Sequence, residues 1–322
     1  MTKQGLGTKA IRFFQIAFAV GILVWLWQVV GGEQALLLLA EADPLWLIAA
    51  FMVLTLQTLL SALRWKITAQ ELGIKLSIKT ALSEYYLAQL VNQALPGGII
   101  GDAGRAVRSR NEAGLLSSSQ SVIFERLSGQ VGLLIVLVTA LGTTFVIPGG
   151  VSWPLWILLT VVGLIAVFLV AGISLSVIAR RFSGSLSRGL LSFGFAAKKV
   201  FLSPSSIAAH LALSLGTAIC NVAGFTFAAW AVASSLNFSL ALVLVPLILL
   251  AMLLPLTVSG WGLREGVAVA LFPIAGFAAV EGLAASVAFG LVSLAVALPG
   301  LFFAQSPTSK NFGRDGKLEK SK

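Results

Sequence analysis

Charged residues, cysteine and histidine are scarce in this sequence. Only 11% of its 322 residues are Asp, Glu, Lys or Arg, whereas a soluble domain carries about 25%. The single cysteine, Cys220, excludes a disulfide, a cysteine-based zinc site or a redox pair within the chain. One histidine, His210, cannot supply the His-Glu-x-x-His pattern of zinc proteases. We therefore expect no metal and no other cofactor.

Nucleotide and nucleic-acid motifs are also missing. No Gly-x4-Gly-Lys-Ser/Thr segment is present, so ATP does not drive this chain through a loop of that kind. The net charge is +10, but the basic residues lie between hydrophobic segments and not in an aromatic–basic pattern. This placement favours contact with anionic lipid headgroups over nucleic acid.

Hydrophobic residues, in contrast, make up 58% of the chain, and the mean hydropathy is +0.98. Such an excess must face lipid, where only helices or closed barrels satisfy their backbone. Runs of about 20 apolar residues favour helices that cross the bilayer. The first run, Phe13 to Val30, is too long for a signal peptide, so we expect it to stay as a span. The six predicted spans lie near 11–30, 44–63, 121–147, 153–178, 206–233 and 281–303.

Two further apolar regions, 80–110 and 239–273, are interrupted by proline and glycine. The first break is Leu95-Pro96-Gly97-Gly98, and the second lies between Pro255 and Gly262. Each half is too short to span, and lipid cannot satisfy the freed backbone groups. We therefore predict two re-entrant helical hairpins.

Basic residues fix the predicted orientation, because they favour the cytoplasmic side. The predicted outer loops near 31–43, 148–152, 234–238 and 274–280 contain no Lys or Arg. All 22 basic residues except Arg264 then lie on the inner side, with both termini cytoplasmic. The expected location is the plasma (inner) membrane. Three spans separate the two hairpins, so the hairpins enter from opposite faces as an inverted repeat.

The two breaks share a short motif. Gly101 and Gly260 each follow a proline by five residues, and Arg105 and Arg264 follow it by nine. A helix that starts inside the membrane presents free N–H groups, and an arginine adds a planar fork that suits phosphate. A buried arginine costs about 2.5–3.5 kcal/mol even on lenient insertion scales, which favours a polar cavity or a bound anion. The alternative is that each arginine only pairs with a neighbouring acid, Asp102 or Glu265.

Other polar residues leave two interpretations open. Asn92 and Gln93, on one side of the half-helix before the first break, either line a hydrophilic path or satisfy hairpin backbone. Glu125 and Arg126 either cap a span or pair with the hairpin. A stripe from His210 through Ser214, Thr217 and Asn221 to Gly224 indicates either tight packing or a substrate contact. The predicted substrate-binding set, with no catalytic residue, is Asn92, Gln93, Gly98, Gly101, Asp102, Arg105, Glu125, Arg126, Gly260, Gly262, Arg264 and Glu265.

Two blocks carry a family resemblance. The segment from Leu95 to Arg105, followed by Glu125-Arg126-Leu127, and the segment from Pro255 to Glu265 resemble the flippase-like transmembrane family of lysylphosphatidylglycerol synthase. The resemblance covers roughly residues 10–303. Trp261 stands where that family usually has glycine, and Gly129 where an acidic residue is expected.

In bifunctional members of that family, this domain moves an aminoacylated phospholipid between leaflets and a soluble aminoacyl-transfer domain follows it. Other members are thought to handle other lipids or polyprenyl-linked sugars. The resemblance therefore implies an all-α polytopic membrane protein with about six transmembrane helices and two inverted re-entrant hairpins. A flippase-like domain, 1–305, would precede a disordered basic cytoplasmic tail, 306–322, and we expect no synthase activity.

The leading hypothesis is a non-enzymatic flippase or scramblase-like transporter. Its ligand would be an anionic or zwitterionic phospholipid or a lipid-linked sugar, and membrane lipids would surround the protein. The sequence is also compatible with an oligomer. One rival is an intramembrane lipid-modifying enzyme, which the single histidine and the lack of paired intramembrane Asp disfavour. A second is a non-transporting partner of a glycosyltransferase or lipid synthase.

Cysteine labelling tests the predicted topology. After Cys220 is removed, single cysteines placed in 274–280 should react with an impermeant maleimide added outside intact cells. Labelling that requires permeabilised membranes would contradict the predicted orientation.

Overall fold

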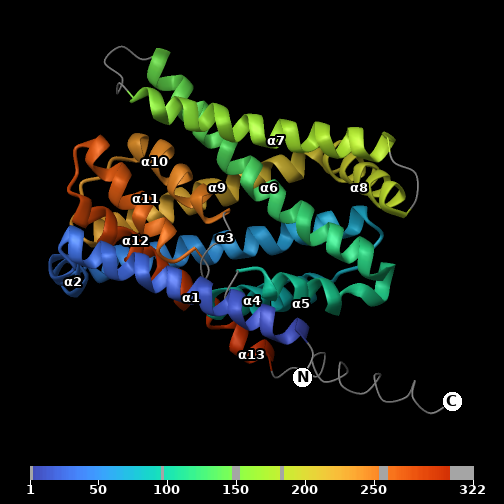
Figure 1. Cartoon of the computed structure of the whole chain (residues 1–322), viewed down its shortest axis with the longest axis horizontal. Coiled ribbons are helices and arrows are strands. Elements are labelled where there is room, and N and C mark those ends of the chain that lie inside the picture. The colour runs from blue at the N-terminus through green and yellow to red at the C-terminus, as the bar shows by residue number, and fades with distance from the viewer. Residues whose placement is uncertain (1–2, 96–97, 147–152, 182–184, 254–259, 305–322) are drawn as a thin grey trace.

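The computed structural model describes residues 3–95, 98–146, 153–181, 185–253 and 260–304, and these ranges contain only helices and their connections (Figure 1). The predicted all-α fold is therefore confirmed for this part of the chain. The helices are α1 Lys3–Val30, α2 Gly32–Ala40, α3 Pro44–Glu71, α4 Ile78–Ala94, α5 Ile100–Arg108, α6 Arg110–Val146, α7 Leu155–Arg181, α8 Ser185–Phe201, α9 Ile207–Ala231, α10 Phe238–Leu250, η1 Ala251–Leu253, α11 Leu263–Leu271, η2 Phe272–Ala275, α12 Ala279–Ala297 and α13 Gly300–Ala304.

Among the described residues, five helical segments are long and apolar enough to cross a membrane. A sixth candidate is Phe14–Val30 together with Gly32–Ala40, a pair bent by 91°. The multi-pass architecture is thus confirmed, with five or six spans. The five segments are Pro44–Glu71, Ala113–Thr144, Leu155–Ser174, Ile207–Ala231 and Ala279–Phe303.

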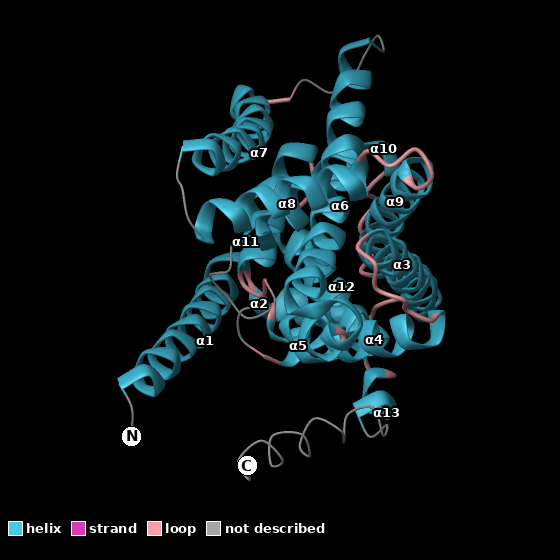
Figure 2. Ribbon diagram, turned by 90° about the vertical axis from the view of Figure 1, so that its right-hand side faces the viewer, coloured by secondary structure: helices cyan, strands magenta, loops and turns pink. Residues whose placement is uncertain are grey.

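Helices α3 and α9 form the centre of the bundle and run antiparallel. The N–H of Asp43, just before α3, donates to the carbonyl of Ala231 at the end of α9 at 2.9 Å. Small residues allow close packing there, because a Cβ on Gly224 would lie 2.7 Å from the Leu54 side chain. In contrast, α7 lies at the edge of the bundle (Figure 2): it packs against α8 and through Ile157 and Val161 against the core, and only 11% of its apolar window is buried.

The second span is longer than the sequence indicated. Residues 44–63 were predicted as the span, with Arg64 and Lys66 in the following loop. Instead α3 continues to Glu71, and Arg64 is buried with 3% exposure. The helix can hold this arginine because buried polar partners surround its guanidinium.

The first interrupted region folds back on itself at the predicted break. Helix α4 ends at Ala94, α5 begins at Ile100, and the two pack so closely that a Cβ on Gly101 would lie 2.0 Å from the carbonyl oxygen of Ala88. The side chain of Asn92 ties the pair together, since its Oδ1 accepts from the N–H of Gly101 at 2.7 Å.

The second interrupted region also consists of two packed short helices, α10 and α11. Helix α10 contains Pro246 and ends at Leu250, before the turn η1. Gly260 and Gly262, which lead into α11, have φ values of 80° and 87°, a region that favours glycine. Pro255 lies outside the described residues.

The turns that follow α3 and α9 have the same geometry. In the first, the N–H of Ile74 donates to Ala69 O at 2.9 Å, and in the second the N–H of Ser234 donates to Ala229 O at 3.1 Å. The residue before each donor has positive φ, 85° and 61° respectively. A span, this turn and a broken helix pair therefore follow one another twice along the chain.

The remaining predictions concern the ends of the chain and its surface. Residues 185–201 form a helix, α8, within the predicted interfacial stretch 180–201, and its position relative to a membrane stays a prediction. The predicted disordered tail, 306–322, lies outside the described residues, and so do Pro96 and Gly97 of the first break.

Substitution of Gly101 tests the closeness of α4 and α5. Gly101→Ala places a methyl group against fixed backbone, so we expect a loss of about 1–3 kcal/mol in stability. Gly142→Ala in α6 is the matched control, because no atom lies within 4 Å of its added Cβ. Thermal unfolding in detergent should show a lower midpoint for Gly101→Ala only, and equal midpoints would argue against the packed pair.

Candidate functional site

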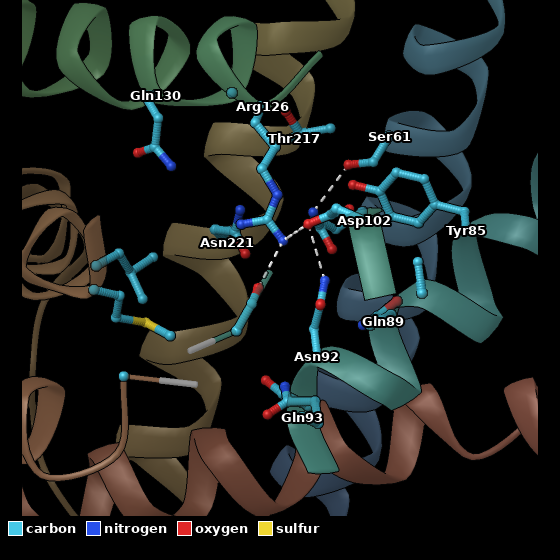
Figure 3. A pocket seen from close by; sticks show the side chains of 18 of the residues that line it. Ser61, Tyr85, Gln89, Asn92, Gln93, Asp102, Arg126, Gln130, Thr217 and Asn221 are labelled. Atoms are coloured by element: carbon cyan, nitrogen blue, oxygen red, sulfur yellow. Dashed lines mark hydrogen bonds and ion pairs between the residues drawn. The ribbon is translucent and has the colours of Figure 1, made fainter. Parts of the chain in front are cut away.

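A cavity of about 500 Å³ lies between the two broken helix pairs and the central spans (Figure 3). Gly98 and Ile99, at the first break, lie on its wall together with Gly260 and Arg264 from the second. Two segments that are distant in sequence thus converge on one space. The wall contains both charged groups and uncharged amides.

Glu125 on α6 is the centre of the charged wall. Its carboxylate accepts from Arg64 Nη2 at 2.8 Å, from Arg105 Nη2 at 2.8 Å and from the Tyr85 hydroxyl at 3.3 Å. Thr217 on α9 accepts from Arg64 Nη1 at 2.7 Å. The Glu125 side chain is 1% exposed, so its charge is stabilised by these partners and not by water.

Asp102 on α5 is the second carboxylate of the wall. It pairs with Arg105 at 2.9 Å and with Arg126, and it accepts from Asn92 Nδ2 at 3.0 Å. Because Asn92 also holds the backbone of Gly101, it both lines the cavity and satisfies hairpin backbone. The backbone contact expected of Asn92 is therefore present, and its part in a hydrophilic path stays a prediction.

Arg105 is buried between aromatic rings and carboxylates, which it contacts through Nη2, while its Nε and Nη1 have no hydrogen-bond partner among the described residues. Its guanidinium carbon lies 4.7 Å from the ring centroids of both Trp65 and Tyr85, and its side chain is 1% exposed. Aromatic faces and two carboxylates thus compensate the cost of burying this charge. The expected pairing of Arg105 with Asp102 is present, and Glu125 adds to it.

Arg264 on α11 has a similar environment built from other residues. It donates to Glu265 Oε1 through Nη2 at 2.5 Å and to Ser286 Oγ through Nε at 2.9 Å. Its guanidinium carbon lies 4.9 Å from the ring of Trp261. Gly290 on α12 leaves room for it, because a Cβ there would lie 2.3 Å from Arg264 Nη2.

Glu265 is fully buried behind Arg264. Besides that arginine, it accepts from the N–H of Gly262 at 2.6 Å and from Ser286 Oγ at 3.1 Å. It does not line the cavity. Its contacts show that it orients Arg264 and closes the first turn of α11.

Arg126 differs from the other arginines of the wall. Its side chain is 44% exposed and extends into the middle of the cavity, where Nη2 contacts Asp102 and donates to the carbonyl of Gly98 at 3.1 Å (Figure 3). It is the accessible cation of the site, because the side chains of Arg64, Arg105 and Arg264 are at most 4% exposed.

The uncharged part of the wall is rich in amides. Gln89 on α4 and Gln130 on α6 face the space together with Asn221 on α9 (Figure 3). Gln57 and Ser61 from α3 complete this polar surface. Such groups donate and accept hydrogen bonds without adding charge.

The predicted residues separate into two groups. Gly101, Gly262 and Glu265 lie behind the wall and shape it. The residues that line the cavity are Asn92, Gln93, Gly98, Asp102, Arg105, Glu125, Arg126, Gly260 and Arg264.

Several lining residues were not predicted from the sequence, among them Arg64, Tyr85 and Gln130. The sequence feature that could have placed Arg64 inside a helix is the absence of any helix-breaking residue directly after Leu63. The feature that could have identified Gln130 is its position four residues after Arg126, one helical turn along the same face. The stripe on α9 is mixed: Thr217 and Asn221 line the cavity, while Gly224 packs against Leu54.

Charge in the wall is unbalanced. The described lining residues include the four arginines Arg64, Arg105, Arg126 and Arg264, against the two carboxylates Asp102 and Glu125. Counting Glu265 behind the wall still leaves one positive charge in excess. The site is therefore suited to an anion that also forms hydrogen bonds.

Fold and site together define a polytopic helical membrane protein with a positively charged, hydrogen-bonding cavity. The sequence matches the family described as "Lysylphosphatidylglycerol synthase TM region" over residues 12–300, and the chain belongs to this family. Searches among curated proteins and among solved structures found no match. The family relates the chain to membrane-lipid metabolism or transport.

Substitution of Glu125 tests its central place in the wall. Glu125→Gln removes the negative charge that Arg64 and Arg105 share, and we expect a loss of about 3–5 kcal/mol, typical of a broken buried pair. Glu33→Gln, at an exposed position on α2, should change stability by less than about 0.5 kcal/mol. Thermal or denaturant unfolding in detergent measures both, and similar stabilities would contradict the proposed network.

Proposed function

We propose that this protein moves a phosphate-bearing lipid between the two leaflets of a membrane, without chemically altering it. The observation that carries the proposal is a single cavity bordered by both broken helix pairs, with four arginines facing two carboxylates. The three buried arginines are matched by Asp102, Glu125 and Glu265, so the excess positive charge is that of Arg126, which is accessible to an anion inside the cavity. Family membership relates that anion to membrane lipids.

The repeated order of elements supports a transport architecture. Two antiparallel spans, α3 and α9, are each followed by the same turn and by a broken helix pair. We propose that these pairs are re-entrant hairpins of an inverted repeat, entering from opposite faces. Such repeats place binding sites at the repeat interface near the bilayer midplane and permit access from alternate sides.

We assign the phosphate contact to Arg126, because it is the accessible arginine of the wall. Its partner Asp102 also contacts Arg105, so Arg126 can turn toward a ligand phosphate without leaving that carboxylate unpaired. Nη1 of Arg264 makes no hydrogen bond to the described residues and provides a second donor at the other hairpin. In this arrangement the headgroup crosses through the cavity while the acyl tails stay in lipid.

The same proposal includes an orientation. Both termini would be cytoplasmic and the location would be the plasma membrane, because basic residues are absent from the predicted outer loops. The ligand would be a phospholipid or a lipid-linked sugar.

Reconstitution into liposomes tests the transport proposal. Phospholipids carrying the fluorophore on an acyl chain should exchange leaflets in vesicles with wild-type protein, as read by dithionite quenching. Arg264→Ala should reduce the rate by about tenfold or more, the effect of losing about 1.4 kcal/mol of headgroup binding. Arg108→Ala should leave the rate within about twofold, since Arg108 lies outside the cavity and pairs with Glu84 at 2.5 Å.

Two results would contradict the proposal. The first is no exchange by wild-type protein across a broad lipid panel. The second is an equal loss in the Arg264→Ala and Arg108→Ala variants at equal folded content, which would show that the cavity arginine has no special part.

A further inference from the structure

We propose that the cavity recognises a phosphate joined to an uncharged, hydroxyl-bearing group and discriminates against an aminoacylated headgroup. This inference rests on the proposed lipid transport and specifies its substrate class. It depends on three features of the cavity wall: the carboxylates, the accessible arginine and the amides.

Every oxygen of the two carboxylates is already paired with an arginine. Each oxygen of Glu125 already accepts a hydrogen bond, Oε1 from Arg64 and Tyr85 and Oε2 from Arg105. Each oxygen of Asp102 is likewise in contact with an arginine. An ammonium that took Oδ1 of Asp102 or an oxygen of Glu125 would compete with a buried arginine for its partner, at a high cost in free energy.

The free charge of the cavity has the opposite sign. Arg126 is the accessible cation, and the wall as a whole carries more arginines than carboxylates. A lysine ester adds ammonium groups to a phosphate headgroup and reverses its net charge. Like charges placed side by side disfavour binding, so the same surface that attracts a phosphate repels a lysyl group.

The amides select the chemical group that can lie beside the phosphate. Gln130 lies one helical turn after Arg126 on the same face of α6, with about 5–6 Å between the two Cβ atoms, and both face the cavity (Figure 3). Its Oε1 is buried and has no hydrogen-bond partner among the described residues, so a ligand can satisfy it once the amide turns toward the cavity. An acceptor of this kind requires a donor, which a phosphate lacks and a hydroxyl supplies.

A headgroup with a phosphate and a hydroxyl a few bonds away satisfies both side chains. Glycerol, inositol and sugar phosphates have this chemistry, whereas phosphatidic acid lacks the hydroxyls and choline has no donor. Gln89, Asn221 and Ser293 provide further uncharged groups around the same space. The structure therefore assigns Gln130 as a specificity-determining residue that acts next to the phosphate site.

Leaflet exchange tests the assignment with phospholipids that differ only in headgroup and with one lipid-linked sugar. The panel contains phosphatidylglycerol, lysylphosphatidylglycerol, phosphatidic acid, phosphatidylcholine and a polyprenyl phosphate sugar. We expect phosphatidylglycerol or the sugar lipid to move at least about tenfold faster than lysylphosphatidylglycerol, a ratio that corresponds to about 1.4 kcal/mol. Gln130→Leu should bring the preferred lipid down to the rate of phosphatidic acid.

Gln120→Leu is the matched control for that variant. Gln120 lies on the same helix and its Nε2 is also buried without a partner among the described residues, but it does not line the cavity. It should leave the headgroup preference unchanged. Lysylphosphatidylglycerol moving as fast as phosphatidylglycerol, or equal effects of the two leucine variants, would overturn the assignment while leaving transport intact.

Native mass spectrometry separates recognition from transport. Wild-type protein offered phosphatidylglycerol and lysylphosphatidylglycerol in equal amounts should retain the former, and Gln130→Leu should lose this preference. If no lipid exchanges leaflets but this preference is found, the headgroup assignment stands and the transport proposal falls. If neither exchange nor preference is found, both fall.

Discussion

The burial of arginine inside an apolar helical bundle is the constraint on which this structure depends. Arg64 and Arg105 are 3% and 1% exposed, and both donate to Glu125. That carboxylate lies within 2.8 Å of both guanidinium groups and joins α3, α5 and α6. The helices of the first half are therefore held at fixed distances by charge as well as by apolar packing.

In the second half of the chain, the buried arginine is stabilised by partners that lie closer to it in the sequence. Arg264 pairs with its sequence neighbour Glu265 and with Ser286, and an aromatic ring again covers its guanidinium. Because this network is local to α11 and α12, it leaves the opposite side of the guanidinium directed to the cavity. The two arginines occupy matching motif positions, and each has guanidinium nitrogens without a hydrogen-bond partner among the described residues, Nε and Nη1 in Arg105 and Nη1 in Arg264.

These two networks explain why a polar space can persist in a protein with 58% hydrophobic residues. The carboxylates are saturated by arginine, and one further cation, Arg126, extends into the space. Amide side chains cover the rest of the polar wall. An anionic ligand that draws Arg126 away from Asp102 would still leave this carboxylate paired with Arg105, so the buried part of the network stays intact.

Much of this architecture can be predicted from the sequence, and the exceptions have physical causes. Proline and glycine located both breaks, since lipid does not tolerate free backbone groups. The depth of Arg105 could not be predicted, because it depends on Trp65 and Glu125, which only the packed bundle brings together. Arg64 was assigned to a loop, since hydropathy treats a charge as the end of a span even when a buried partner stabilises it. Gln130 was missed because its role depends on the face that α6 turns toward the cavity.

The most direct test of the account is the position of a lipid phosphate in an experimental structure of the protein in nanodiscs that contain phosphatidylglycerol. The account predicts phosphate density inside the cavity, within hydrogen-bond distance of the Arg126 guanidinium and on the side that faces Arg264. Lipid phosphates found only around the outer surface of the bundle, with water alone in the cavity, would contradict it.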